Sequence, residues 1–189
     1  MTRIISGEAR GRIIKVPPHV TRPTTDRARE GVFSSLQVRF GFIDACVLDL
    51  FAGSGALGLE AASRGAARVD LVESDASACA VIRANADVVK HPNVHVHEMK
   101  VSSFLAGAQK ESYDMVLMDP PYEMAGETVV EILNALVPVL REGAAVVVER
   151  HSASEETDWP EGFTPTGQKL KKRTYSRTRM DMATFSRED

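Results

Sequence analysis

The chain has 189 residues but only two cysteines, one tryptophan and an aromatic fraction of 6%. Cys46 and Cys79 lie in apolar segments without CxxC spacing, so we expect neither a disulfide nor a metal site. No apolar run approaches the roughly 20 residues of a membrane span, and the segment that begins at Met1 lacks the apolar core of a signal peptide. The lack of such segments predicts a cytoplasmic protein, and the length of 189 residues predicts one domain with a small appendage.

Positive charge is scarce in the middle of the chain and concentrated in two blocks. Residues 1–39 hold eight basic and three acidic side chains, residues 40–168 hold eight basic and twenty acidic ones, and residues 169–179 hold six basic ones and no acid. If the fold brings the two basic blocks together, they form a face for a polyanion such as RNA.

Short β-rich runs alternate with helical patterns through the middle of the chain. We expect strands over 46–50, 68–73, 94–98, 113–119 and 144–149, and helices over 56–64, 75–90 and 127–140. Strands and helices in this alternation form a parallel sheet that is covered on both faces. The core is therefore predicted to be α/β, with an antiparallel strand pair over 163–186.

The first 40 residues have a different pattern. The apolar pairs in 3–6 and 12–15 flank a glycine-containing turn and predict a hairpin. Prolines then interrupt regular structure, and the Thr-Thr-Asp sequence from Thr24 offers caps for a helix over about 26–39. We expect residues 1–40 to form an extension of a main domain over 41–189.

A glycine-rich segment joins the first of the core strands to its helix. Gly53 and Gly55 permit a sharp turn and leave room for a ligand beside the backbone. With Gly58 they fit the pattern GxGxxG, and Glu73 follows Gly53 by twenty residues. Both dinucleotides and S-adenosylmethionine need an adenosine ribose held by a carboxylate, so this pattern alone does not separate them.

Asp49 favours S-adenosylmethionine, because a carboxylate at this strand end reaches a cationic amino group rather than a pyrophosphate. Segment 49–55 also closely resembles the first motif of class I methyltransferases. The resemblance implies that Gly53 and Gly55 lie along the methionine part of the donor and that Glu73 binds both ribose hydroxyls. The expected cofactor is S-adenosyl-L-methionine, and its expected binding residues in this region are Asp49, Phe51, Ala52, Gly53, Ser54, Gly55, Glu73 and Ser74.

The segment Asp119-Pro120-Pro121-Tyr122 comes directly after the fourth core strand. A carboxylate and a proline-fixed carbonyl can each accept one N–H of an exocyclic amine on a base. This draws the nitrogen lone pair out of conjugation and aims it at the methyl group. The Tyr122 ring would stack on the unstacked base. The segment is similar to the (Asn/Asp)-Pro-Pro-aromatic motif of amino-group methyltransferases, and these four residues are the expected catalytic ones.

Together the motifs resemble the RsmD family of bacterial enzymes, which methylate guanine N2 in 16S ribosomal RNA. The resemblance covers nearly the whole chain and includes segments 6–12, 22–30, 51–61, 103–105 and 119–122. It implies a Rossmann-like class I methyltransferase fold with a mostly parallel seven-stranded sheet. It also implies that residues 119–122 bind the target guanine and that the assembled or assembling 30S subunit is the partner of a monomeric enzyme.

The expected RNA contacts lie in the two basic blocks. The resemblance implies that Arg22, Thr24 and Arg29 close over either the donor pocket or the RNA, and both options stay open. The full set of expected RNA-binding residues is Arg3, Arg10, Arg12, Lys15, Arg22, Thr24, Arg27, Arg29, Lys171, Lys172 and Arg173.

One position departs from the family pattern near the expected adenine site. An Asp, an Asn or a small polar residue is expected before segment 103–105, but the chain has Lys100-Val101-Ser102 there. Contact with the adenine is therefore assigned to backbone groups of Val101 and Ser102.

Other functions remain as alternatives. An adenine-N6 DNA methyltransferase or a protein glutamine methyltransferase would share the donor site, but those enzymes often carry Asn at the position of Asp119. An NAD-dependent oxidoreductase would share the glycine loop but gives no role to segment 119–122. A non-enzymatic RNA-binding or assembly factor is disfavoured because every expected catalytic position is filled.

Overall fold

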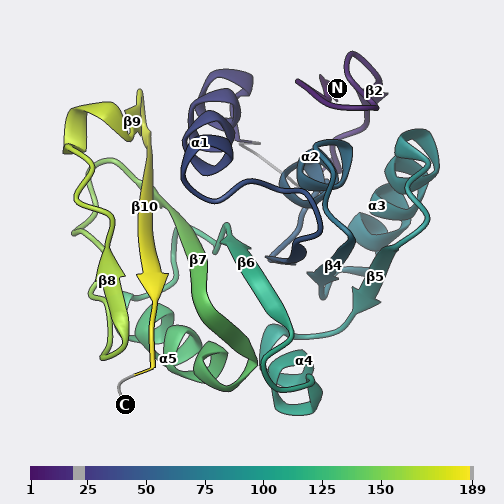
Figure 1. Ribbon diagram of the computed structural model, residues 1–189. Helices are drawn as coiled ribbons and strands as arrows, with labels where there is room; N and C mark the ends of the chain where they lie inside the picture. Colours follow the sequence, from purple (N-terminus) through teal and green to yellow (C-terminus); the bar gives the residue numbers. More distant parts are fainter. Residues whose placement is uncertain (19–23, 188–189) are drawn as a thin grey trace.

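The computed structural model describes residues 1–18 and 24–187 (Figure 1). In chain order its elements are β1 (Thr2–Arg3), β2 (Ile13–Ile14), α1 (Asp26–Arg39), β3 (Cys46–Leu50), α2 (Ala56–Ser63), β4 (Arg68–Glu73), α3 (Ala76–Val89), β5 (Val94–Glu98), α4 (Val101–Gly107), β6 (Tyr113–Met118), α5 (Gly126–Leu136), the 3-10 helix η1 (Val137–Val139), β7 (Leu140–His151), β8 (Phe163–Pro165), the 3-10 helix η2 (Leu170–Lys172), β9 (Thr174–Tyr175) and β10 (Thr178–Phe185).

One mostly parallel sheet forms the centre of the molecule, as expected. Its strand order is β5-β4-β3-β6-β7-β10-β8, and the two-residue β9 pairs with β10 beside this path. Strands β5 to β7 in this order run parallel, and β10 is antiparallel to both β7 and β8. The carboxyl ends of the parallel strands therefore meet at one edge, which is where open α/β sheets bind their ligands.

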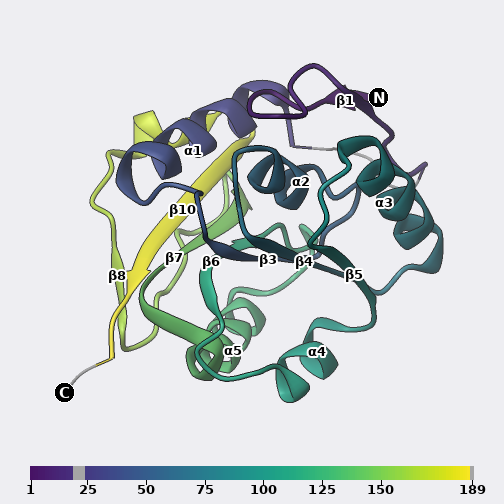
Figure 2. The same cartoon turned by 45° about the vertical axis from the view of Figure 1, so that its right-hand side comes forward.

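Helices cover both faces of this sheet. Helices α1, α2 and α3 lie on one face, and α4 and α5 lie on the other (Figure 2). Each face buries its own apolar cluster, one containing Val47, Leu117 and Val147 and the other containing Leu48 and Val116. Alternation along the strands explains this division, because successive side chains point to opposite faces. Within residues 1–18 and 24–187, no helix has the length and apolar character that a membrane span requires.

Several predicted boundaries are confirmed. Helix α1 spans Asp26–Arg39, and the Thr25 side chain accepts a hydrogen bond from the Ala28 amide at its start. The Asp75 side chain caps α3 in the same way. The helix expected over 127–140 starts as predicted but is shorter, because α5 spans Gly126–Leu136. Pro138 has no amide hydrogen and cannot continue an α-helix, so a short 3-10 turn follows instead.

The structure differs from the sequence prediction at two further elements of the core, β7 and α4. Strand β7 covers Leu140–His151 rather than 144–149, because pairing of Leu140 with Tyr113 of β6 extends its start and antiparallel pairing with β10 extends its end. Helix α4 was not expected, since its seven residues are too few to show a clear helical period.

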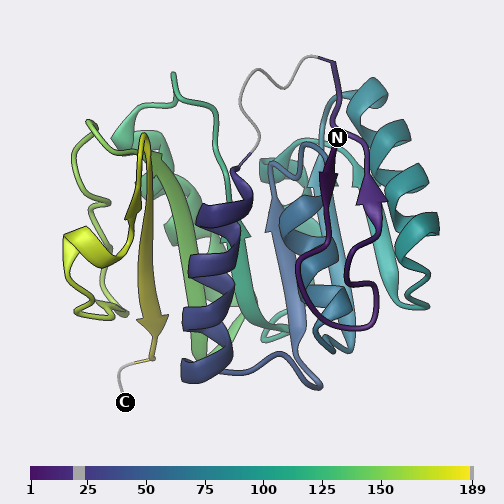
Figure 3. The same cartoon turned by 90° about the horizontal axis from the view of Figure 1, so that it is seen from above.

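The N-terminal hairpin packs beside α2 and α3 (Figure 3). Ile4 and Ile14 are buried in the same apolar cluster as the adjoining face of the sheet. Asn85 of α3 strengthens the junction, because its side chain bonds the Lys15 backbone and donates to the Ser54 carbonyl in the glycine loop. The hairpin is thereby connected to the loop that was expected to hold the donor. The division of the chain at residue 40 stays a prediction.

Candidate active site

The glycine loop connects β3 to α2 at the carboxyl edge of the sheet. Gly53 and Gly55 have φ angles of 59° and 78°, a region that favours glycine. Gly58 allows the start of α2 to pack closely against Leu71 of β4, because a Cβ atom at this position would lie 2.6 Å from Cδ2 of Leu71. The loop can therefore pass tightly over the strand ends and present its backbone to a ligand.

Asp49 lies beneath this loop with only 1% of its surface exposed. Its Oδ2 accepts a hydrogen bond from the Gly58 amide at 2.9 Å, whereas Oδ1 is buried and has no hydrogen-bond partner within the described residues. Burial raises the pKa of Asp49 well above its ordinary value, and the nearby carboxylates of Glu73 and Glu149 raise it further. A buried carboxylate with one free oxygen is suited to a cationic donor group.

Glu73 is held at the end of β4, facing the glycine loop. Its Oε2 accepts from the Gly53 amide at 2.9 Å, and its Oε1 accepts from the Asp75 amide at 3.0 Å. These bonds fix the direction of the carboxylate and leave lone pairs on both oxygens. The arrangement can bind a pair of hydroxyl groups.

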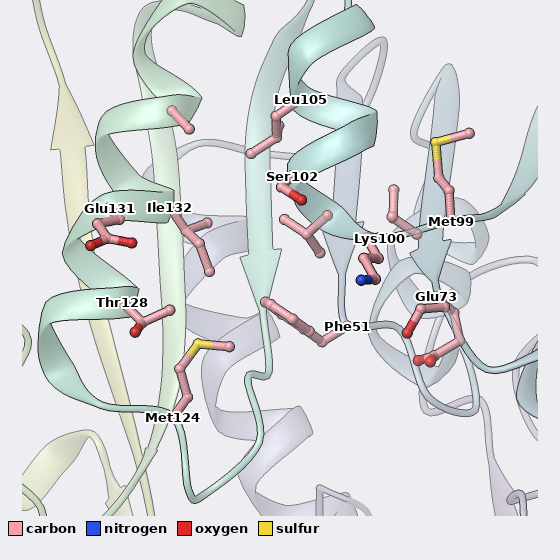
Figure 4. A pocket seen from close by; sticks show the side chains of 14 residues that line it. Phe51, Glu73, Met99, Lys100, Ser102, Leu105, Met124, Thr128, Glu131 and Ile132 are labelled. Atoms are coloured by element: carbon pink, nitrogen blue, oxygen red, sulfur yellow. The ribbon is translucent and has the colours of Figure 1, made fainter.

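A pocket of about 390 Å³ brings together five predicted cofactor residues, namely Phe51, Glu73, Ser74, Val101 and Ser102 (Figure 4). Side chains of α5, including Thr128 and Ile132, form the opposite wall, and Lys100 lies between Phe51 and Met99. Val101 and Ser102 begin α4, where backbone amides have no partner inside their own helix. Contact of these amides with an adenine ring stays a prediction that this location supports.

A second pocket of about 490 Å³ adjoins the first, since Phe51, Glu73 and Ser74 line both. All four residues of segment 119–122 line this second pocket, together with Gly53 of the glycine loop. The two adjoining pockets therefore place six of the predicted donor residues next to the predicted acceptor segment, whereas Asp49, Ala52, Ser54 and Gly55 line neither pocket.

Asp119 follows β6 directly and is only partly exposed. Burial raises its pKa well above the ordinary value, and the negative charges of Glu149 and Asp49 act in the same direction. Tyr122 is 50% exposed, and its ring lies edge-on to His151 with 5.3 Å between centroids. Tyr122 is therefore accessible to a base beside the acceptor group.

Glu149 is a residue of the site that the sequence predictions omitted. It lies near the end of β7, is 9% exposed and lines the pocket that contains Asp119. The Thr24 hydroxyl donates to its Oε2 at 2.5 Å. The available signal was its position after the apolar run of its strand, which is the position Asp119 holds in β6. Thr24, for which contact with the donor pocket or with the RNA was left open above, lines an adjacent pocket together with Tyr122 and Glu149.

The two basic blocks come together next to this site. A pocket shared by Thr2, Thr24, Tyr175 and Arg177 also includes Tyr122 and Glu149. Helix α1 lies close to Tyr175, because a Cβ atom at Gly31 would lie 2.0 Å from the tyrosine oxygen. The exposed predicted RNA contacts are Arg3, Arg10, Arg12, Lys15, Arg27, Lys171 and Lys172.

The structure separates some of these predicted RNA contacts from the pocket. Arg12 donates to the Val88 and Val89 carbonyls at the end of α3. The hairpin turn that carries Arg10 is bonded to Ser63, the last residue of α2, through the Glu8 amide. Since α2 begins at the glycine loop, this turn lies toward the opposite edge of the sheet.

Arg29 requires a correction, because it is fully buried and has no surface to offer RNA or a donor. Its guanidinium donates to Asp26, to the Thr2 hydroxyl and to the Arg3 carbonyl, and so fastens α1 to β1. Arg173 is also engaged within the protein, in ion pairs with Glu156 and Asp181. Arg22 lies outside the described residues.

The chain is similar to known proteins over nearly its whole length. Residues 2–183 match a family described as "Conserved hypothetical protein 95". The Escherichia coli K12 protein "Ribosomal RNA small subunit methyltransferase D" is 45% identical over 122 residues, which are 64% of this chain and 60% of that protein's length. "Putative rRNA methyltransferase YlbH" of Bacillus subtilis is 32% identical over 166 residues, with coverage of 84% and 86%.

A solved structure is similar to this chain in both sequence and fold. "Putative methyltransferase yhhF" from Escherichia coli superposes with a TM-score of 0.81 at 34% identity and covers 99% of both chains. The expected class I methyltransferase fold is thus confirmed.

Proposed function

Because this chain belongs to the RsmD family, we propose that it transfers a methyl group from S-adenosylmethionine to guanine N2 in 16S ribosomal RNA. The observation that carries the proposal is the second pocket, which Asp119, Pro120 and Tyr122 line together with Gly53 and Glu73. A donor and an amino group on a base could meet there without rearrangement of the sheet.

The chain's own residues suit the donor. The free Oδ1 of Asp49 would accept a hydrogen bond from the cationic amino group of the methionine part, and Glu73 would bind the ribose hydroxyls. The amides of Val101 and Ser102 would contact the adenine. When bound, S-adenosylmethionine supplies an activated methyl group on a positively charged sulfur.

Asp119 and the Pro120 carbonyl would each accept one N–H of the guanine amino group. This orientation turns the nitrogen lone pair toward the methyl group. On methylation the nitrogen would lose one proton to a nearby carboxylate or to solvent, and S-adenosylhomocysteine would leave. Tyr122 would stack on the base after it leaves its helix.

The wider surface supports an RNA substrate. The N-terminal residues and the turn between β9 and β10 meet beside Tyr122, so the exposed cations Arg27 and Arg177 lie near the proposed acceptor site. A domain of this size has little area for reading sequence, and we propose that the shape of the assembled or assembling 30S subunit supplies the recognition. Such a substrate would place the enzyme, proposed to be a monomer, in the cytoplasm.

The test is transfer of labelled methyl groups to small ribosomal subunits from cells that lack this protein, followed by nucleoside analysis. We expect N2-methylguanosine with the wild type and at least a 100-fold lower rate with Asp119→Ala, while the affinity for S-adenosylmethionine stays within about threefold. Asp87→Ala, at an exposed position of α3, is the matched control. Label in adenine N6 of DNA or in a glutamine amide of a protein would replace the proposal by one of those activities.

A further inference from the structure

Asp119 and Glu149 occupy neighbouring positions on adjacent strands. Met118 of β6 pairs with Val148 of β7, and each carboxylic residue is the next one along its strand. Adjacent strands lie about 4.8 Å apart, and side chains at equivalent positions point to the same face. Both carboxyl groups therefore project on the α1 side of the sheet, at the edge where the cavity opens.

Glu149 is held in place by a segment from the other end of the chain. Its Oε2 accepts a hydrogen bond from Thr24, which stands just before α1, and the Thr178 hydroxyl of β10 is a second donor. Burial raises the pKa of Glu149, whereas these two hydroxyls favour its ionised form. A carboxylate has about four acceptor positions, so the two threonines leave capacity for a ligand.

Nothing in the described part of the chain balances this charge. None of the ion pairs formed by residues 1–18 and 24–187 includes Glu149. A buried carboxylate without a cation is costly to a folded protein unless hydrogen-bond donors satisfy it. Thr24 and Thr178 supply part of these donors, and because Glu149 lines the acceptor pocket, a ligand with N–H groups would supply more.

We propose that Glu149 determines the specificity for guanine by accepting the N1–H of the target base while Asp119 accepts the neighbouring N2–H. This inference rests on the proposed function and deepens it. Guanine presents N1–H and N2–H₂ as adjacent donors on one edge, which two adjacent carboxylates match. Adenine presents an amino group beside a bare N1 lone pair, and that lone pair would face the Glu149 carboxylate. Thr24 acts as a positioning residue that fixes the direction of this carboxylate.

The test uses 2-aminopurine, which keeps the 2-amino group of guanine but has a lone pair at N1. Once the methylated guanine is mapped, 16S RNA carrying either base at that position is assembled by ligation, reconstituted into small subunits and methylated in single-turnover reactions. We expect the wild type to prefer guanine by about 10- to 100-fold, the range expected for a buried carboxylate that loses its donor.

Glu149→Gln should reduce this preference to within about threefold, because an amide can turn either its oxygen or its N–H₂ group toward N1. Glu127→Gln, an exposed position at the start of α5, should keep the wild-type preference. Thr24→Val, which keeps the carboxylate but removes its hydroxyl partner, should give an intermediate preference. It supplies the answer if Glu149→Gln does not fold.

The possible failures can be told apart. A wild type that methylates guanine N2 with equal rates on both bases, or variants that keep the full preference, would overturn the role of Glu149 and leave the proposed function intact. A wild type that labels no guanine N2 would overturn the proposed function, and with it this inference.

Discussion

Glu60 of α2 accepts a hydrogen bond at 2.8 Å from the backbone amide of Ile5, so a fully buried carboxylate fastens the N-terminal hairpin to the sheet domain. Its other oxygen accepts from the Ser6 amide and pairs with Arg64, both at 3.0 Å. A charge in this position is stable only because each oxygen has donors.

Replacement of Glu60 by Ala should therefore reduce the free energy of unfolding by about 3 kcal/mol, because it leaves Arg64 and two amides without their acceptor. Urea denaturation followed by circular dichroism measures this loss. Glu30→Ala removes an exposed glutamate of α1 and should change stability by less than about 0.5 kcal/mol. Equal effects of the two variants would show that the hairpin does not depend on Glu60.

Asp49→Asn should have opposite effects on stability and on donor binding. Burial raises the pKa of Asp49 above the ordinary value of 3.8, so the folded protein binds this proton more tightly than the unfolded chain does. The contribution of Asp49 to stability therefore falls as pH rises above that value. Without donor, the variant should gain stability relative to the wild type between pH 4 and pH 7.

The same variant should bind S-adenosylmethionine about 10- to 100-fold more weakly at pH 7, because it loses a charge-assisted hydrogen bond. Thermal unfolding across this pH range and calorimetric titration measure the two effects. Asp87→Asn, at an exposed position of α3, is the control. A stability difference that does not vary with pH, or an unchanged affinity, would contradict the assigned role.

Tyr122→Ala should weaken use of the RNA without weakening the donor site. Stacking of a base on an aromatic ring contributes about 1–3 kcal/mol, so the KM for small subunits should rise by at least fivefold. Tyr122→Phe keeps the ring and should stay within about twofold of the wild type. Steady-state methylation with varied subunit concentration separates the two variants, and a phenylalanine variant as impaired as the alanine one would point to the hydroxyl instead of the ring.

Features set by neighbouring residues were predictable from sequence. The turn at Gly53 and the cap of α1 at Thr25 depend on only a few positions along the chain. Glu149 was missed because the position of its carboxylate in the pocket depends on Thr24, which is 125 positions away and contacts it only in the folded chain. Arg29 was misassigned for the same reason, since its acceptors in β1 become its partners only when α1 packs against that strand.

The location of the basic blocks leads to a prediction on RNA binding. Arg177 lines the pocket that contains Tyr122, and the charge of Arg27 acts on Tyr175 of the same pocket. Arg10 lies at the hairpin turn near the far end of α2, about 12 Å of helix from the glycine loop. Each phosphate contact that is lost should lower the slope of log K against log salt by about 1.

Arg27→Glu and Arg177→Glu should therefore each weaken binding to small subunits and flatten its salt dependence, and Arg10→Glu should do so less. Filter binding between 50 and 200 mM salt, concentrations at which phosphate contacts change affinity strongly, measures both quantities. An Arg10 variant with the largest change would move the RNA path onto the hairpin. The acceptor guanine would then reach the pocket across α2 rather than past the β9–β10 turn, because the path must connect the phosphate contacts to Tyr122.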